Sequence, residues 1–223
     1  MSSNSSAPAS IAMVYLVDDE KVVRAALAWL LRSRRLLSQS FDSAESFEAA
    51  LDEPAVASPE HWPAGPSCML LDLRMGGMSG LSLFDRLAQR GLTQAMPVIF
   101  LTGHGDVATA VSAIKRGAFD FVEKPFSDNA LVDRVESALA ASRLWLDARA
   151  DREHQVRTLQ QLSEREGAVM ELISRGLPNK LIADNLSLSI RTVEIHRARV
   201  FEKLGVNSAV ELVNVLHALR TPP

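Results

Sequence analysis

The sequence predicts a doubly wound α/β domain with a five-stranded parallel sheet, joined by a helical linker to an all-α domain of four helices. Three observations support this fold class. Up to about residue 126, short apolar runs alternate with segments of helical spacing, as in parallel sheets covered by helices on both faces. Beyond that point the spacing of apolar residues is helical throughout. The 223 residues are enough for two domains that each bury a core.

Strands and helices alternate in the first half of the chain. The predicted strands are 12–17, 36–41, 68–73, 96–103 and 120–125, and the predicted helices between them are 21–33, 43–51, 80–91 and 106–117. Ser43 precedes the second helix, but the third residue after it is Ser46 rather than Glu or Gln, so we expect no full capping box. Residues 52–67 contain four prolines and are expected to form an extended loop, to which the sequence assigns no role.

The second half of the chain is predicted to be helical. A helix over 127–146 leads into a charged segment with few apolar residues, for which a solvated linker helix and a flexible tether are equally good interpretations. Ser163 and Glu166 then form a capping box at the start of a helix that ends near Gly176. Further helices are expected at 179–186, 190–204 and 208–219, with Ser189 capping the second of these and Gly205 ending it.

Two short helices, a tight connection and a longer helix are typical of a helix-turn-helix domain. The predicted domain boundaries are a disordered tail at 1–11, the α/β domain at 12–128, its last helix and the linker helix at 129–160, and the all-α domain at 161–221.

Composition and charge exclude several classes of protein. The net charge of −3 excludes a globally basic nucleic-acid binder, although residues 151–223 carry +1 and residues 1–150 carry −4. Cys68 is the single cysteine, so we expect no disulfide and no cysteine-based zinc site, but a small core residue. The polar N-terminal segment does not resemble a signal peptide, and no apolar run approaches membrane-spanning length. A cytoplasmic location without membrane contact is therefore expected.

Reactive side chains lie at or just after the carboxyl ends of four predicted strands. Asp18 and Asp19 follow the first strand, Asp72 lies at the end of the third, Thr102 ends the fourth, and Lys124 ends the fifth. We expect them to meet, because the carboxyl ends of parallel strands share one edge of a sheet. Each residue alone has an ordinary structural role in a turn or cap, but together they favour a phosphoryl site. Crowded carboxylates repel unless a cation joins them, and Mg²⁺ prefers such oxygens. Asp72 would then be the nucleophile that forms an aspartyl phosphate.

Five segments resemble the receiver domain of bacterial two-component response regulators. They are VYLVDDE (14–20), LLDLRM (70–75), GMSG (77–80), VIFLTGHGD (98–106) and GAFDFVEKPF (117–126). The resemblance implies that a sensor histidine kinase phosphorylates Asp72. It also implies that Mg²⁺ binds Asp19, Asp72 and the backbone carbonyl of Arg74 directly, and Asp18 through water. By the same resemblance, Thr102 and Lys124 sense the phosphoryl group, and Phe121 is the aromatic switch. The Lys124–Pro125 bond is expected to be cis.

One position departs from this family pattern. Family members commonly have proline where this chain has Gly76. Proline fixes φ, whereas glycine leaves the backbone free. We therefore expect a more mobile loop and an altered lifetime of the phosphoryl group, both of which Gly76→Pro should change.

The helix predicted at 190–204 has two different faces. At about 100° per residue, its core face holds Val193, Val200 and Leu204. The opposite half holds Arg191, Glu194, Ile195, Ala198, Arg199 and Glu202, which suits either a DNA major groove or a merely solvated surface. His196 is expected to be structural, and Arg197 to pair with an acid such as Glu166 or to reach a phosphate. Thr192, Lys203 and Lys180 are candidate contacts to backbone phosphates.

A second resemblance favours the DNA interpretation. LSEREGAVMELISRGLPNKLIADNL (162–186) and SIRTVEIHRARVFEKLGV (189–206) resemble the LuxR-type DNA-binding domain. The resemblance implies that helix 190–204 is the recognition helix and that helix 208–219 makes the dimer contact. Val210, Val213 and Leu216 are its candidate contact residues, although the stripe that they form with Leu212 and Leu219 also suits the domain's own core.

The two resemblances together predict a phosphorylation-dependent transcription regulator of the nitrogen-fixation regulator branch. Its expected partners are the kinase, promoter DNA, a second copy after phosphorylation, and RNA polymerase. It is expected to be a phosphoacceptor that assists its own phosphorylation and dephosphorylation rather than an enzyme. One alternative is a phosphate-gated protein-interaction module. The other, an aspartyl-phosphate hydrolase of the haloacid-dehalogenase type, needs a second Asp two residues after the nucleophile, which neither DDE (18–20) nor DLR (72–74) supplies.

Overall fold

The computed structural model of the chain describes residues 11–52, 62–103 and 107–220. The chain forms two compact units, Met1–Leu146 and Asp147–Pro223. The predicted tail, apart from Ile11, and most of the predicted proline-rich loop lie outside the described residues.

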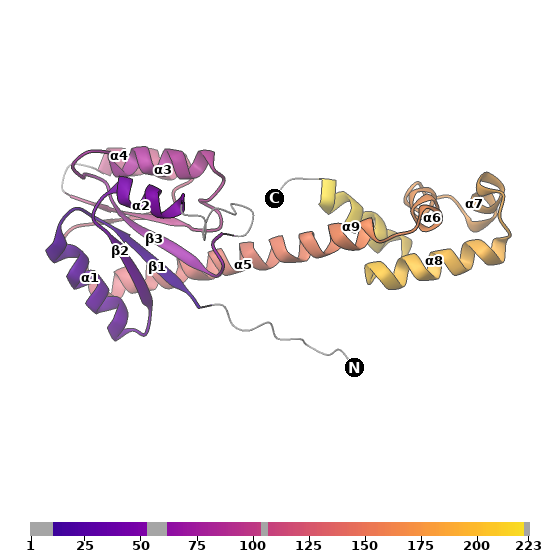
Figure 1. The fold of residues 1–223 in the computed structure, drawn as a ribbon, viewed down its shortest axis with the longest axis horizontal. Coiled ribbons are helices and arrows are strands. Elements are labelled where there is room, and N and C mark those ends of the chain that lie inside the picture. The colour runs from indigo at the N-terminus through magenta and orange to yellow at the C-terminus, as the bar shows by residue number, and fades with distance from the viewer. Residues whose placement is uncertain (1–10, 53–61, 104–106, 221–223) are drawn as a thin grey trace. The chain divides into compact units, whose positions relative to one another are not determined.

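A five-stranded parallel sheet is the centre of the first unit (Figure 1). Its strands are β1 (Met13–Val17), β2 (Leu37–Phe41), β3 (Ser67–Asp72), β4 (Val98–Thr102) and β5 (Asp120–Glu123). The spatial order is β2-β1-β3-β4-β5, so the direction of winding reverses between β1 and β3. Open α/β sheets bind ligands at the carboxyl ends of the strands on either side of such a reversal. The predicted doubly wound fold is confirmed.

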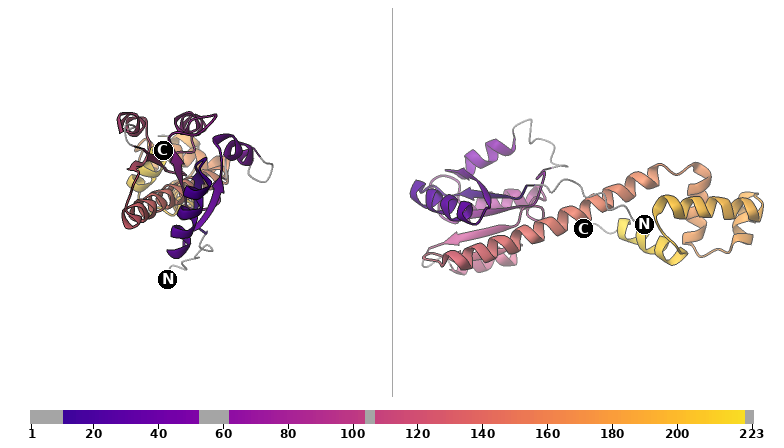
Figure 2. Two further views of the ribbon diagram at one scale, coloured as in Figure 1. Left: turned by 90° about the vertical axis from the view of Figure 1, so that its left-hand side faces the viewer. Right: turned by 90° about the horizontal axis from the view of Figure 1, so that it is seen from below.

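Helices cover both faces of this sheet (Figures 1 and 2). The helices α2 (Ala44–Leu51), α3 (Gly80–Gln89) and α4 (Val107–Lys115) pack on one face, and α1 (Lys21–Ser33) and α5 (Asp128–Gln160) pack on the other. Strand β3 is buried along its whole length, with Met69 and Leu71 in the first core cluster and Cys68 and Leu70 in the second. This alternation is the period of two that a strand imposes, and it makes Cys68 the core residue that was expected.

The start of α2 corrects one prediction. The Ser46 N–H donates to Ser43 Oγ over 3.2 Å, and the Ser43 N–H donates to Ser46 Oγ over 3.3 Å. The capping box that the sequence was expected to lack is therefore present. The serine hydroxyl reaches back to the N-cap amide as a glutamate carboxylate would.

The second unit is helical, as predicted. Helices α6 (Glu164–Ser174), α7 (Asn179–Leu186), α8 (Ile190–Leu204) and α9 (Ala209–Arg220) surround a small core. Ser163 and Glu166 form the expected capping box, and Gly205 ends α8 in the left-handed region with φ of +64°. Residues 128–160 form one continuous helix, so the charged segment is helical, and its part from Asp147 on belongs to the second unit. Among the described helices, none is long and apolar enough to cross a membrane.

Gly80 provides a test of the close packing beneath the sheet edge. A Cβ atom at this position would lie 2.0 Å from the carbonyl oxygen of Asp72, so that α3 or β3 would have to move. We expect Gly80→Ala to lower the free energy of unfolding of the first unit by about 1–3 kcal/mol. Gly76→Ala is the matched control, since its Cβ would meet nothing nearer than 3.8 Å.

Urea unfolding followed by tryptophan fluorescence measures this effect, because Trp29, Trp62 and Trp145 all belong to the first unit. Equal unfolding midpoints for the two variants would contradict the close approach at Gly80.

Candidate functional site

Two buried carboxylates and one ammonium meet at the carboxyl edge of the sheet. The Lys124 Nζ donates to Asp72 Oδ1 over 2.7 Å and to Asp18 Oδ2 over 3.0 Å. The exposed fraction is 1% for Asp18 and 8% for Asp72. The structure thus brings together three of the predicted site residues, from β3 and from the loops that follow β1 and β5.

Burial and pairing act in opposite directions on these groups. Burial raises the pKa of Asp72, the Lys124 ammonium lowers it, and the nearby Asp18 raises it, so that the net shift is upward. For Lys124, burial favours a lower pKa, but the hydrogen bonds to Asp72 and Asp18 outweigh it and raise the pKa. Lys124 is therefore charged at neutral pH and is the cation that holds the two acids in place.

Each of the three predicted acids accepts one backbone N–H. Glu20 donates to Asp18 Oδ1 over 2.8 Å, Arg74 donates to Asp72 Oδ2 over 2.9 Å, and Gly76 donates to Asp19 Oδ2 over 2.9 Å. Asp19 itself is exposed to solvent. The loop that follows β3 supplies two of the three donors, so its conformation determines how these carboxylates are oriented.

A fourth carboxylate, which the sequence analysis did not single out, holds the same loop. The Met78 N–H donates to Glu45 Oε1 over 2.8 Å. Gly77 has φ of +81°, and a Cβ atom there would lie 2.9 Å from the same oxygen. The sequence offers one signal for Glu45, its position in the first turn of α2. The predicted mobility of this loop stays a prediction, but two carboxylates from outside the loop hold it through backbone N–H groups.

The predicted switch residues lie on the next two strands of the sheet, Thr102 at the end of β4 and Phe121 in β5. Thr102 is fully buried, and its Oγ1 has no hydrogen-bond partner among the described residues. A buried hydroxyl without a partner is unusual and calls for a functional explanation. Phe121 is half-buried and packs against the core cluster of α2, α3 and α4. The Lys124–Pro125 bond is cis, as the resemblance implied.

The donor set of this pocket fits a magnesium ion. Among the described residues, no group of three or more His, Cys, Asp or Glu side chains is arranged as a preformed metal cluster. Mg²⁺ does not need one, because it binds through one or two carboxylates and keeps several waters. Three carboxylates against the single Lys124 ammonium leave an excess of negative charge, which a divalent cation would neutralise.

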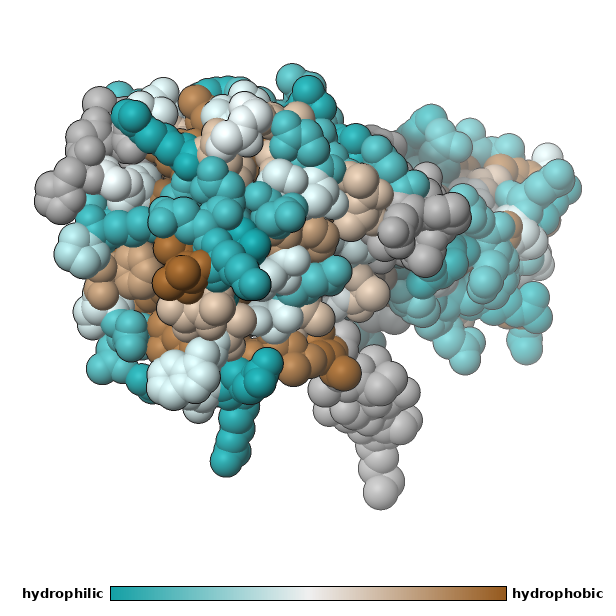
Figure 3. All heavy atoms as spheres, turned by 60° about the vertical axis from the view of Figure 1, so that its left-hand side comes forward, coloured by the Kyte–Doolittle hydropathy of each residue, from teal (hydrophilic) through white to brown (hydrophobic). Residues whose placement is uncertain are grey.

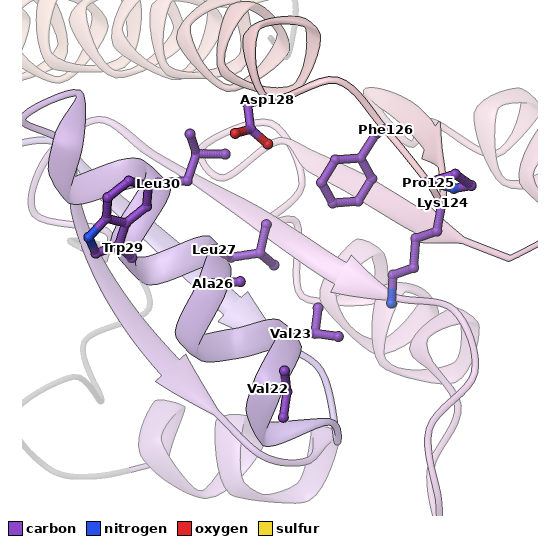
Figure 4. Close-up of a pocket in the computed structure, with 10 residues that line it drawn as sticks. All are labelled: Val22, Val23, Ala26, Leu27, Trp29, Leu30, Lys124, Pro125, Phe126 and Asp128. Atoms are coloured by element: carbon purple, nitrogen blue, oxygen red, sulfur yellow. The ribbon is translucent and has the colours of Figure 1, made fainter.

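An apolar groove of about 590 Å³ lies next to the pocket (Figure 4). Residues of α1 form one wall, and the segment from Lys124 to Asp128 forms the other. On α1, Val22 is 81% exposed and Trp29 is 70% exposed. Hydrophobic residues interrupt the hydrophilic surface of the first unit in the space-filling view (Figure 3). The groove shares Lys124 with the acid pocket, so a partner bound there would lie close to Asp72.

Helix α8 presents the two faces that the helical wheel predicted. Val193 and Val200 are fully buried in the core of the second unit. The predicted base-reading residues are exposed, namely Arg191, Glu194, Ile195 and Arg199. Lys180 on α7 is also exposed, whereas the Thr192 hydroxyl shares a hydrogen bond with Ser189.

Two basic residues of α8 make contacts that differ from those expected. Lys203 pairs with the buried Glu166 over 2.7 Å and donates to the Gln161 carbonyl over 3.3 Å. This hydrogen bond holds the pKa of Glu166 at about 2. The expected pairing of Arg197 with Glu166 is wrong, because Arg197 donates to Asn179 Oδ1 over 3.2 Å and lies over the Phe201 ring. Lys203 thus connects the C-terminal end of α8 to the start of α6, and Arg197 connects the middle of α8 to the start of α7.

The apolar stripe of α9 divides between core and surface. Leu212 is fully buried, and Leu216 packs against the same core cluster. Val210 is 70% exposed, and Val213 is exposed as well. Of the three candidate dimer residues, Val210 and Val213 are therefore on the surface, while Leu216 contributes to the domain's own core.

The raised pKa of Asp72 predicts how stability depends on pH. A carboxyl group whose pKa is raised by folding destabilises the native state when it is ionised. We expect Asp72→Asn to raise the free energy of unfolding of the first unit at pH 7. This gain should shrink as the pH falls through the raised pKa and should vanish below the ordinary carboxyl value of 3.8.

Urea unfolding followed by tryptophan fluorescence between pH 3 and pH 8 checks the expectation. Asp133→Asn, on the exposed surface of α5, is the control for loss of one negative charge. A destabilised Asp72→Asn protein at pH 7 would contradict the argument.

Comparisons with known proteins agree with the two units. A family model described as the response regulator receiver domain matches residues 14–136, and one described as bacterial regulatory proteins of the luxR family matches residues 160–216. Over 203 residues the chain is 42% identical to the C4-dicarboxylate transport transcriptional regulatory protein DctR of Rhodobacter capsulatus, which covers 91% of this chain and 98% of DctR. It is 40% identical over 203 residues to FixJ of Rhizobium meliloti (strain 1021), with 91% and 93% covered.

Solved structures show the same likeness over both units. The response regulator StyR is 35% identical, with a TM-score of 0.77 over 94% of this chain and 100% of the StyR chain. Full-length FixJ from B. japonicum is 34% identical, with a TM-score of 0.54 over 97% of this chain and 100% of the FixJ chain.

Proposed function

The chain belongs to the two-component response regulators that combine a receiver domain with a LuxR-type DNA-binding domain, and we propose that phosphorylation of Asp72 controls its binding to promoter DNA. One observation carries this proposal. Asp72 lies at the end of a buried strand, with one carboxylate oxygen bonded to the Lys124 ammonium and the other bonded to the Arg74 N–H. A carboxylate in this setting is fixed in position for attack on a phosphoryl group.

The transfer step follows from this geometry. An oxygen of Asp72 attacks the phosphorus of a phosphohistidine on the sensor kinase, so that the O–P bond forms while the P–N bond breaks and the imidazole leaves. Lys124 stabilises the negative charge that collects on the phosphoryl oxygens. Mg²⁺, held by Asp19, Asp72 and the Arg74 carbonyl and by Asp18 through water, would supply further positive charge to those oxygens when bound.

The switch uses the buried Thr102. Its hydroxyl has no hydrogen-bond partner among the described residues, so it is available to donate to a phosphoryl oxygen on Asp72. Movement of Thr102 leaves room for Phe121 to turn inward from its half-buried position. The surface formed by α4 and β5 then changes, and the population shifts toward a form in which two copies pair.

The second unit supplies the DNA contacts. Arg191, Glu194, Ile195 and Arg199 form the exposed face of α8 and are placed to read base edges in the major groove. The exposed Lys180 contributes positive charge toward the phosphates. Arg197 and Lys203 contribute less, because each also makes a contact within the domain. Val210 and Val213 on α9 provide the contact between two copies on DNA, where RNA polymerase is a further partner.

The proposed function also implies a location and a surface for the kinase. A regulator that binds promoter DNA and RNA polymerase acts in the cytoplasm. The groove between α1 and the segment after β5 is the surface on which the kinase approaches Asp72, since Lys124 belongs to both.

The direct test is the mass of the protein after incubation with Mg²⁺ and acetyl phosphate, beside an Asp72→Asn control. We expect one phosphoryl adduct that requires Mg²⁺ and is absent from the control. The adduct should appear together with dimers in light scattering and with tighter binding to promoter DNA. An adduct that persists in Asp72→Asn would contradict the assignment of the phosphoacceptor.

The recognition helix makes a separate prediction. We expect Arg199→Ala to weaken binding to a promoter fragment by roughly tenfold, in line with the 1–3 kcal/mol that a good side-chain contact to a base contributes. Arg175→Ala is the control, because this residue lies at the end of α6 and pairs there with Glu171. Gel shifts at several salt concentrations measure both affinities, and equal affinities for the two variants would exclude Arg199 from the interface.

A further inference from the structure

The three carboxylates of the pocket are not held equally. Asp18 and Asp72 each have one oxygen on a backbone N–H and the other on Lys124. Asp19 is exposed, and within the described part of the chain its single hydrogen bond is the one that Oδ2 accepts from the Gly76 N–H over 2.9 Å. The orientation of Asp19 therefore depends on one backbone amide, and its Oδ1 is left for another ligand.

Proline at position 76 could not make this contact, because proline has no backbone N–H. Position 76 is glycine in this chain, where the resemblance to receiver domains implied proline. We propose that Gly76 is a positioning residue, whose N–H orients the Asp19 carboxylate as a ligand for Mg²⁺. The inference rests on the magnesium site of the proposed function and adds to it a residue that sets cation affinity.

Glu45, which lies outside the loop, also holds the loop in place. Its Oε1 accepts the Met78 N–H, two residues beyond Gly76, over 2.8 Å. Its first-turn position on α2 fixes this acceptor to the core, since Phe47 of the same helix is fully buried. The loop is thus held at two amides by two carboxylates, so that the Gly76 N–H stays directed at Asp19 in the absence of the cation.

The size of the effect follows from other metal sites. Hydrogen bonds that orient a ligating carboxylate typically change metal affinity by about 10–100-fold when they are removed. Asp19 is exposed, so that water can replace part of the lost hydrogen bond, and we expect a change of about tenfold.

Titration calorimetry of the full chain with Mg²⁺ alone tests the proposal on Gly76→Pro and Gly76→Ala. Alanine keeps the N–H, and its Cβ would lie 3.8 Å from Asp19 Oδ2, an ordinary contact. We expect Gly76→Pro to raise the Kd for Mg²⁺ about tenfold and Gly76→Ala to leave it within about twofold. Unchanged or tighter binding by Gly76→Pro would overturn the proposal, as would equal weakening in both variants, which would implicate backbone freedom instead of the amide.

A second pair of variants keeps the test decisive if Gly76→Pro does not fold. Glu45→Gln retains an oxygen acceptor for Met78, whereas Glu45→Ala does not. We expect faster hydrogen exchange at the amides of Met78 and Gly76 and weaker Mg²⁺ binding in Glu45→Ala than in Glu45→Gln. Identical exchange and affinity in the two variants would overturn the role of the loop.

The same protein samples distinguish a failure of the inference about Gly76 from a failure of the proposed function. Acetyl phosphate should still place one phosphoryl group on Asp72 in Gly76→Pro at saturating Mg²⁺. If that adduct forms while the Mg²⁺ affinities of all variants agree, the phosphoacceptor stands and the inference about Gly76 fails. If the unaltered protein binds no Mg²⁺, both the magnesium site and this inference fail.

Discussion

Negative charge crowded at one edge of a parallel sheet is the constraint on which the first unit depends. Asp18 and Asp72 are buried there, and like charges at short range in a poorly solvated site favour protonation or disorder unless something compensates them. The compensation is a single ammonium from beyond β5, together with one backbone N–H for each acid. The strand order β2-β1-β3-β4-β5 places the ends of β1 and β3 side by side. Lys124 can therefore donate hydrogen bonds to both Asp18 and Asp72.

The same constraint explains why the loop after β3 is rich in glycine. The Gly80 N–H donates to the Leu73 carbonyl over 3.2 Å, and its Cα lies so near Asp72 that no side chain fits. Gly77 adopts a positive φ beside the Glu45 carboxylate. Small residues let the chain turn back tightly over the acid and leave its amides directed at carboxylates. The glycines of this loop thus allow backbone N–H groups to point at the carboxylates and to stabilise their negative charge.

Sequence reasoning recovered the features that periodicity and strand order determine, namely the sheet, its helices, the convergence of Asp72 with Lys124, and the exposed face of α8. It did not recover features that depend on side-chain reach between elements. The one sequence signal for Glu45 is its position in the first turn of α2, and its contact with the loop depends on where that helix packs. Lys203 was a candidate for phosphate contact, but it reaches back to Glu166 at the start of α6. The prediction that Ser43 lacks a full capping box was wrong, because the Ser46 hydroxyl was not counted as an acceptor of the N-cap amide.

Helix α5 limits how phosphorylation can reach the DNA-binding unit. In the first unit, Ser142 anchors the helix by donating to the Ala95 carbonyl and accepting the Ser67 N–H. In the second unit, Arg152 anchors it to the carbonyls of Ala218 and Leu219 at the end of α9. The intervening turns stay helical, with Arg149 paired to Glu153 one turn later over 2.9 Å. Because these turns connect the two units covalently, a shift that starts at Asp72 can reach the second unit through this helix or by bringing two copies of the chain together. In both cases the gain at the promoter cannot exceed the difference in free energy that the phosphoryl group creates between the two forms of the first unit.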